Sequence, residues 1–220
     1  MHTEHYDKFY KHYDFPQFLF ADKFVVKGII KKLSMKMKSR ILDLGCGTGR
    51  FASLFDRYGM DSYGIDLSLS AIKRARIRYP KTKYLQMDAN DLQFEKKSFD
   101  LIFSHGFSLF NVKNLDERKE FMDYIFSFLK EKSTFLFIMT SRLNGNYNKN
   151  MFYNHKISDL KMFFDENYCK EFKIEYYTLF PQLFYLFRKL IFSSSLSRIC
   201  NLTTNVSKIP LRLYIFLKGI

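Results

Sequence analysis

The stretch ILDLGCGTGR, residues 41–50, is a short apolar run followed by glycines at positions 45, 47 and 49. The run itself is typical of a buried strand, and a helix is expected to begin where the glycines end. Glycine adopts positive φ and has no Cβ, so the main chain of such a turn can lie directly against a ligand. We therefore expect a small polar ligand on this turn.

The rest of the chain alternates in the same way between short β-type runs and helical stretches. Helices are predicted near 49–58, 69–79, 115–130 and 156–168, between the runs RILDL, DSYGID, KYLQMD, FDLIFS and TFLFIMT. Because parallel neighbours need a crossover connection, this order predicts a doubly wound α/β fold with a mostly parallel sheet and helices on both faces. Two further strands, FKIEYYTLF (172–180) and PLRLYIFLKG (210–219), have no helical crossover between them and are expected to pair as an antiparallel hairpin at one edge.

The length of 220 residues favours a single domain with additions. We predict an N-terminal helical lid over 1–37, a core over 38–180 and 210–220, and an insertion over 181–209. The three cysteines form no CxxC pair, which favours a reducing compartment. The polar N-terminal stretch and the lack of a long apolar window favour a cytoplasmic protein.

The formal net charge is +14, and the segment 27–40 carries six basic residues and no acid. Such an imbalance favours an anionic partner, whether nucleic acid, a phosphorylated or carboxylated substrate, or acidic lipid. Plain solubility explains the charge equally well.

Two classes of ligand use a glycine turn of this kind. Dinucleotide-binding enzymes have the spacing GxGxxG, with a pyrophosphate at the helix N-terminus. Here the spacing is GxGxG and Asp43 precedes the first glycine by two residues, so a carboxylate would repel a diphosphate but would suit a cationic amine or sulfonium. Asp66 and Asp88 end the next two predicted strands, and together the three acids outline a slot for a nucleoside.

At this point the sequence resembles the class I S-adenosylmethionine-dependent methyltransferases. ILDLGCGTGR, YGIDLS, MDANDL and FDLIFSHGFSLF are similar to the four consecutive ligand-binding motifs of that family, in order, between about residues 38 and 140. The resemblance implies a Rossmann-like methyltransferase fold with seven strands, the last antiparallel. It also implies S-adenosylmethionine as methyl donor and S-adenosylhomocysteine as product.

The resemblance further implies a set of donor-binding residues. Asp43 and the turn would hold the methionine part, Asp66 the ribose and Leu67 the adenine face, whereas Asp88 and Ala89 would read the adenine edge. The end of the fourth strand would lie beside the sulfonium and the acceptor. The remaining candidates are Gly45, Cys46, Gly47, Thr48, Gly49, Ser104, His105 and Gly106.

Several of these residues have a plainer alternative. Asp66 could cap the following helix, although Ser68 is the better cap for a helix starting near Leu69. Asp88 could form an Asx-turn, because DAND is also turn chemistry. His105 is the preferred general base for an acceptor hydroxyl or amine, with pocket shaping or a loop hydrogen bond as the alternative.

Outside these motifs, two aromatic stretches are candidate lids. Tyr6, Tyr10 and Tyr13 share one face of a predicted N-terminal helix, from which Tyr6 and Tyr10 could contact the donor or pack on the sheet. The insertion contains PQLFYLFRKLIF (181–192), which is apolar on both sides of a predicted helix. We expect this segment to cap the acceptor pocket. A homodimer contact is the second alternative, and a peripheral membrane contact through 182–198 is the third. His2, His5 and His12 lack ligand spacing, so no metal site is predicted.

The sequence thus predicts an enzyme that transfers a methyl group to O or N of a small or medium-sized acceptor. Methylation of RNA or of a lipid- or saccharide-linked acceptor, and a non-catalytic donor-binding protein, are the alternatives. Nucleic acid is not favoured, because SHGF follows the fourth strand where adenine-specific DNA methyltransferases would have an NPPY- or DPPY-like tetrapeptide. A nicotinamide oxidoreductase would need GxGxxG and would not tolerate Asp43.

Overall fold

The computed structural model of the chain describes residues 2–12, 20–106, 112, 114–140, 162–163, 172–177 and 212–218. Two helices come first, α1 (His2–His12) and α2 (Phe20–Lys32), and are followed by β1 (Arg40–Leu44), α3 (Arg50–Arg57), β2 (Asp61–Asp66), α4 (Leu69–Arg78) and β3 (Lys83–Gln86). The chain continues with β4 (Phe99–His105), the 3₁₀-helix η2 (Leu115–Arg118), α5 (Lys119–Phe126), β5 (Leu129–Thr140), β6 (Phe172–Tyr177) and β7 (Arg212–Lys218).

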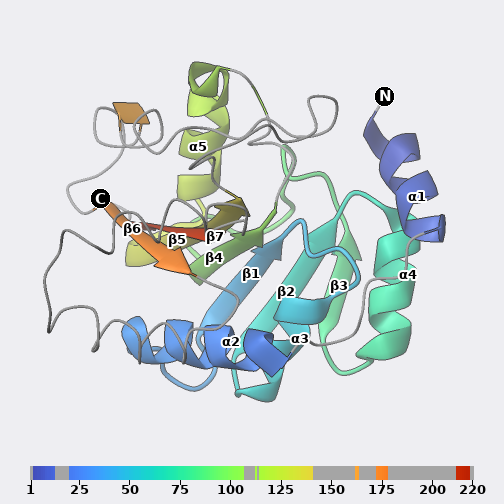
Figure 1. Cartoon of the computed structure of the whole chain (residues 1–220), viewed down its shortest axis with the longest axis horizontal. Coiled ribbons are helices and arrows are strands. Elements are labelled where there is room, and N and C mark those ends of the chain that lie inside the picture. Colours follow the sequence, from blue (N-terminus) through green and yellow to red (C-terminus); the bar gives the residue numbers. More distant parts are fainter. Residues whose placement is uncertain are drawn as a thin grey trace, which may run out of the picture.

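Five parallel strands form the centre of the molecule (Figure 1), in the order β3-β2-β1-β4-β5. This arrangement confirms the predicted Rossmann-like parallel sheet. The strand order reverses between β1 and β4, so the glycine turn after β1 and His105 at the end of β4 share the switch point where α/β folds bind ligands. Beyond β5, strand β7 pairs antiparallel with β5 and with β6.

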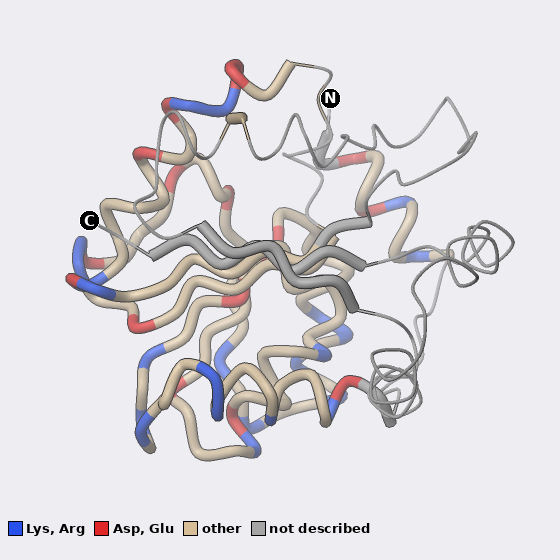
Figure 2. Tube along the Cα trace, turned by 60° about the vertical axis from the view of Figure 1, so that its left-hand side comes forward, with Lys and Arg blue, Asp and Glu red and all other residues tan. Residues whose placement is uncertain are grey.

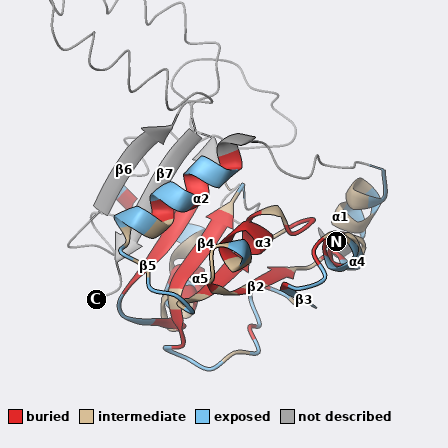
Figure 3. Cartoon of the chain, turned by 90° about the horizontal axis from the view of Figure 1, so that it is seen from below, coloured by how far each residue is buried: buried red, intermediate tan, exposed pale blue. Residues whose placement is uncertain are grey.

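Both faces of the sheet are covered by helices, and the strands alternate between the two cores with the period of a β-strand. Ile41, Leu101 and Phe103 join the core under α2 and α3, whereas Leu42 and Ile102 join the core under α5. Buried residues follow the strands and the inner sides of the helices, while the outer side of α2 is exposed (Figure 3).

The N-terminal region predicted as a helical lid contains two helices with different surroundings. Helix α2 contributes Val26 and Ile29 to the core on the α3 face, so it is packed on the sheet. Helix α1 lies against α4 at the β3 side of the molecule (Figures 1 and 3). Tyr13 and the insertion 181–209 lie outside the described residues, as does most of the helix predicted over 156–168.

Two predicted element boundaries were wrong. The helix predicted over 115–130 is η2 followed by α5, and it ends at Phe126, because Leu129 already pairs with Phe99 as the first residue of β5. The third strand ends at Gln86, so Asp88 lies in the loop that follows, not at the strand end.

Charge is distributed around the outside of this core. Lys and Arg residues lie mostly on the helices and turns around the sheet, and the central strands carry few of them (Figure 2). Among the described residues, no helix combines the length and the apolar composition that crossing a membrane requires.

Candidate functional site

The glycine turn between β1 and α3 has the predicted backbone conformation. Gly45, Gly47 and Gly49 have φ values of 73°, 53° and 84°, in the left-handed region that favours glycine. The turn is tied to its neighbour strand, because the Cys46 amide donates to the Ile65 carbonyl at 2.8 Å. Glycine is therefore required here by the backbone itself, whatever lies on the turn.

Asp66 ends β2 and holds the turn with its side chain. One carboxylate oxygen accepts from the Gly47 amide at 2.9 Å and the other from the Ser68 amide at 2.9 Å. Ser68 is the N-cap of α4 and accepts from the Ala71 amide at 3.2 Å, as predicted. Burial raises the pKa of Asp66, and the two amide hydrogen bonds oppose that shift.

Asp43 is almost fully buried, with 2% of its surface exposed. Its carboxylate accepts from the Ala52 amide at 2.9 Å, in the first turn of α3, where the helix dipole favours negative charge. Burial nevertheless raises the pKa of Asp43 to about 7, with Asp66 adding to the shift and the Ala52 amide and Arg50 opposing it. A carboxyl group with this pKa changes its charge near neutral pH.

Tyr10 of α1 closes over the same turn. Its hydroxyl lies 2.8 Å from the position that a Cβ on Gly47 would occupy. Burial, followed by the negative charge of Asp66, raises the pKa of the Tyr10 phenol, so the group stays protonated. Tyr10 is thus brought together with Asp43, Cys46 and Asp66, although it lies more than thirty positions away in the sequence.

Tyr84 of β3 is a residue of this region that the sequence analysis missed. Its ring lies 2.6 Å from a Cβ built on Gly49 and 2.8 Å from one built on Gly64, and its hydroxyl donates to the Gly49 carbonyl at 2.8 Å. The close approach that Gly49 permits is therefore to this side chain. The one sequence signal is that Tyr84 is the aromatic residue of the predicted run KYLQMD; the structure adds that its strand neighbours Lys83, Leu85 and Gln86 are exposed.

Asp88 adopts the alternative foreseen for it. One of its carboxylate oxygens accepts from the Asn90 amide at 2.9 Å and from the Asn90 side chain at 2.8 Å, which is an Asx-turn on an exposed loop. Ala89 beside it is buried and Leu67 is half-buried. The role of these three residues at an adenine ring stays a prediction.

At the end of β4, three predicted residues have different environments. Ser104 is fully buried and donates to the Leu44 carbonyl at 3.0 Å, which ties the ends of β4 and β1 together. His105 is half-buried, with its ring centroid 4.9 Å from that of Phe51. Gly106 is exposed and has φ 67°, and its amide donates to the Ile138 carbonyl.

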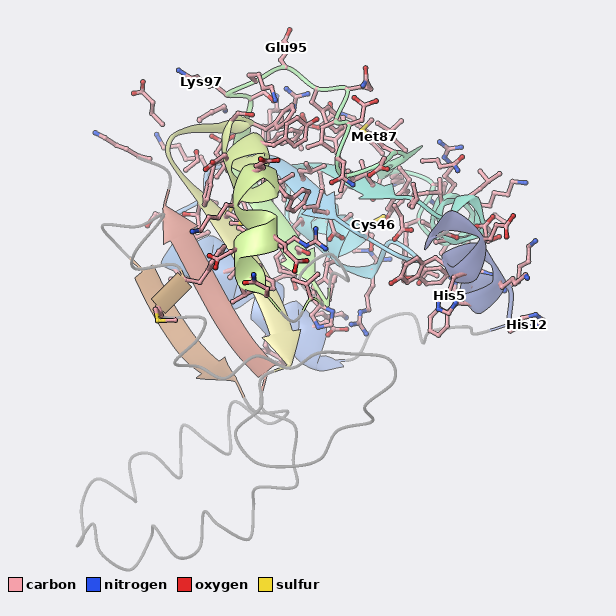
Figure 4. The ribbon with its side chains drawn as sticks, turned by 90° about the horizontal axis from the view of Figure 1, so that it is seen from above. His5, His12, Cys46, Met87, Glu95 and Lys97 are labelled. Carbon is pink, nitrogen blue, oxygen red and sulfur yellow. The ribbon has the colours of Figure 1, made fainter. Side chains whose placement is uncertain are left out.

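The remaining candidates lie in or beside the turn. Thr48 is buried, whereas Gly45, Cys46 and Tyr6 are half-buried. Burial, with smaller contributions from Asp43 and Asp66, raises the pKa of the Cys46 thiol, so it is no activated nucleophile. Cys46 lies at the side of the sheet nearest α1, whereas His12 projects from the far end of that helix (Figure 4).

The electrostatic character of the site follows from these neighbours. Two carboxyl groups, the buried Asp43 and the half-buried Asp66, lie beside one glycine turn, and each raises the pKa of the Cys46 thiol. Such a pair opposes a diphosphate and favours a ligand that carries positive charge. The nearby cation Arg50 is engaged by Asp22, at 3.3 Å.

Comparisons with known proteins agree with this geometry. A family model described as a methyltransferase domain matches residues 42–137, which contain the glycine turn, Asp66, Asp88 and His105. An uncharacterized methyltransferase of Synechocystis sp. is 34% identical over 73 residues, covering 33% of this chain and 34% of that protein. A malonyl-[acyl-carrier protein] O-methyltransferase of Hamiltonella defensa is 35% identical over 68 residues, covering 31% of this chain and 26% of that protein.

Among solved structures, the phosphoethanolamine N-methyltransferase 2 of Haemonchus contortus has the same fold. Its structure, in complex with phosphomonomethylethanolamine and S-adenosylhomocysteine, matches with a TM-score of 0.62 at 18% identity, over 89% of this chain and 52% of that one. Over residues 42–137 the chain is thus similar to proteins with a methyltransferase domain. The matched segments span about a third or less of the two curated relatives, 34% and 26% of their lengths.

Proposed function

We propose that the protein binds S-adenosylmethionine on the glycine turn and transfers its methyl group to O or N of a small or medium-sized acceptor. The observation that carries this proposal is the pair of carboxyl groups beside one turn, the buried Asp43 and the half-buried Asp66. A dinucleotide diphosphate would be repelled by these carboxylates in their ionised form, whereas an ammonium or sulfonium group would be attracted.

The residues of the turn fit such a donor. Each carboxylate oxygen of Asp66 accepts one backbone hydrogen bond, and a carboxylate oxygen has two lone pairs, so the side chain retains acceptor capacity for two ribose hydroxyls. Asp43, once ionised, would attract the ammonium of the methionine part. Leu67 and Ala89 would pack on the adenine, with Asp88 at its edge, and Tyr10 would cover the turn.

For methyl transfer, the main task of the protein is to align the acceptor with the methyl group of the donor. When bound, the donor supplies a methyl group already activated on a sulfonium, so the bond to the acceptor forms while the carbon–sulfur bond breaks and its electron pair stays on sulfur. His105, on Phe51 at the end of β4, would take the proton that the acceptor loses. Ser104 would hold the ends of β4 and β1 in register, since its hydroxyl joins them.

The nature of the acceptor is proposed from charge and from relatives. The net charge of +14 supports an anionic small molecule. The names of the relatives refer to an acyl-carrier-protein-linked malonyl group and to a phosphorylated amine, each of which carries an acid. Nucleic acid stays the less favoured acceptor, and a homodimer or a peripheral membrane contact through 182–198 stays a proposal.

The finer features of the fold and location belong to the same proposal. The antiparallel registers of β7 with β5 and β6 support a seven-stranded sheet with its last strand antiparallel. The cysteine usage supports a cytoplasmic location.

The test combines donor binding with methyl transfer. S-adenosylhomocysteine is expected to raise the melting temperature of the protein and NAD is not, because a ligand stabilises only the state it binds. Asp66→Ala should weaken binding at least several-fold, while the matched Asp91→Ala, on the exposed loop after β3, should not. Labelled donor incubated with fractionated lysate, followed by mass identification of the labelled species, would then give the acceptor; binding without transfer to any fraction would indicate a non-catalytic donor-binding protein.

A further inference from the structure

Three residues through which helix α1 contacts α4 and the glycine turn lie within one helical turn of each other. Asp7, Tyr10 and Lys11 are spaced at i, i+3 and i+4, so they share one face of the helix. Each of them meets a different part of the donor region or of α4. Figures 1 and 4 both place α1 beside α4, with the glycine turn on its inner side.

The contact of Asp7 is the most polar of the three. One of its carboxylate oxygens accepts from the Ser68 hydroxyl at 2.6 Å and from the Ser70 amide at 3.0 Å, at the N-terminus of α4. Both groups lower the pKa of Asp7, with the Ser68 hydroxyl contributing most, so the side chain is ionised at neutral pH. Charge-assisted hydrogen bonds at a helix N-terminus are among the stronger polar contacts of a protein.

Ser68 joins this contact directly to the donor site. Its hydroxyl donates to Asp7 while accepting from the Ala71 amide, and its own amide donates to Asp66. Asp66 in turn accepts from the Gly47 amide. A continuous chain of hydrogen bonds therefore runs from Asp7 through Ser68 and Asp66 to the turn.

Tyr10 closes this chain from the other side. Three residues after Asp7, it lays its hydroxyl over Gly47, the residue that Asp66 holds. At the far end of the contact, the Arg74 side chain donates to the Lys11 carbonyl at 3.0 Å on an exposed surface. The position of Tyr10 is thus fixed between one strong anchor, Asp7, and one exposed contact.

We propose that Asp7 is a positioning residue for the donor site: its hydrogen bonds to Ser68 and Ser70 seat α1 on α4 and thereby hold Tyr10 over the glycine turn. This inference rests on the proposed function, because Tyr10 is assigned there to cover the donor. The hydrogen-bond donors to Asp7, Ser68 and Ser70, lie at the N-terminus of α4. Its effect on donor binding is transmitted through Tyr10 and through Ser68.

The first arm of the test needs no ligand. Asp7→Asn keeps the size of the side chain but removes its charge, and the matched Glu4→Gln does the same at an exposed position of α1. Trypsin should cleave after Lys8 and Lys11 several-fold faster in Asp7→Asn than in the wild type or in Glu4→Gln. The cleavage rate is measured by mass spectrometry of the truncated chain. Equal rates in all three proteins would overturn the proposed anchor.

The second arm measures the dissociation constant of S-adenosylhomocysteine. Asp7→Asn should raise it roughly tenfold, as expected for loss of a hydrogen bond to a charged group, with Glu4→Gln unchanged. Tyr10→Ala should weaken binding in the wild-type background and should have a smaller effect when Asp7→Asn is already present. Unchanged affinity in Asp7→Asn, or fully additive effects, would overturn the proposal.

The two arms separate this inference from the proposed function. If the wild type binds no S-adenosylhomocysteine, the proposed function fails, and Asp7 then has no donor site to position even where the protease arm shows the anchor. If the wild type binds and Asp7→Asn frees α1 without loss of affinity, the proposed function stands and the positioning role is wrong.

Discussion

The titration of Asp43 gives the most specific quantitative prediction. Burial raises the pKa of this carboxyl to about 7, and a cationic donor would bind to the ionised form. With such a pKa the group is about one-tenth ionised at pH 6 and about nine-tenths ionised at pH 8. The affinity for S-adenosylhomocysteine, whose amino group is protonated over this range, should therefore increase roughly tenfold between pH 6 and pH 8 and level off above.

The assay is isothermal titration calorimetry at pH 6, 7 and 8 on the wild type, on Asp43→Asn and on Glu95→Gln. Asp43→Asn retains an oxygen that can accept from the Ala52 amide, but its affinity should be low and independent of pH. Glu95 is exposed and remote from the turn, so Glu95→Gln should titrate as the wild type does. A pH dependence that survives in Asp43→Asn would refute the reasoning.

The same pKa has a consequence for stability. Because the pKa of Asp43 is higher in the folded protein than its ordinary value of 3.8, the folded state retains a proton that the unfolded chain loses. This contribution to stability is present below pH 4 and is lost as the pH rises toward 7. The free energy of unfolding of Asp43→Asn, measured in urea, should therefore improve relative to the wild type from pH 4 to 7 and stay level above.

Four further variants test the geometry of the site. Gly49→Ala should destabilise the protein by about 3 kcal/mol, because φ is 84° and the new methyl group would lie 2.6 Å from Tyr84. Gly106→Ala, with φ 67° and no atom within 4 Å of the new methyl group, should lower the free energy of unfolding in urea by only about 1 kcal/mol. Similar losses in the two variants would contradict this account. Tyr84→Phe should cost about 1 kcal/mol in the same assay through its lost hydrogen bond to the Gly49 carbonyl, and no loss would mean that this bond contributes nothing. His105→Asn should slow labelled methyl transfer about 100-fold while the dissociation constant of S-adenosylhomocysteine stays the same; an unchanged rate would remove His105 as the base.

The local features of the parallel core could be predicted from the sequence because they depend on short-range patterns. The glycine spacing predicts the positive φ values of the turn, and Ser68 is recognisable as the cap of α4. The first two strands have the predicted limits, since their apolar runs end at Asp43–Leu44 and at Asp66, where turn residues follow.

The wrong and missed predictions concern features that tertiary contacts determine. Leu129 belongs by pattern to the preceding helix, but its pairing with Phe99 makes it a strand residue. The side chains over Gly47 and Gly49, Tyr10 and Tyr84, come from α1 and β3, and a single sequence does not pair a glycine with the ring that covers it. Likewise, no local pattern links Asp7 to Ser68, which lie 61 positions apart.

Direct titration of the purified protein with S-adenosylmethionine and with S-adenosylhomocysteine, beside NAD as the diphosphate control, examines the central claim most closely. The two carboxyl groups beside one glycine turn, Asp43 and Asp66, predict measurable heat and a saturable isotherm with both adenosyl ligands and none with NAD. Heat with NAD alone, or with none of the three, would contradict the account.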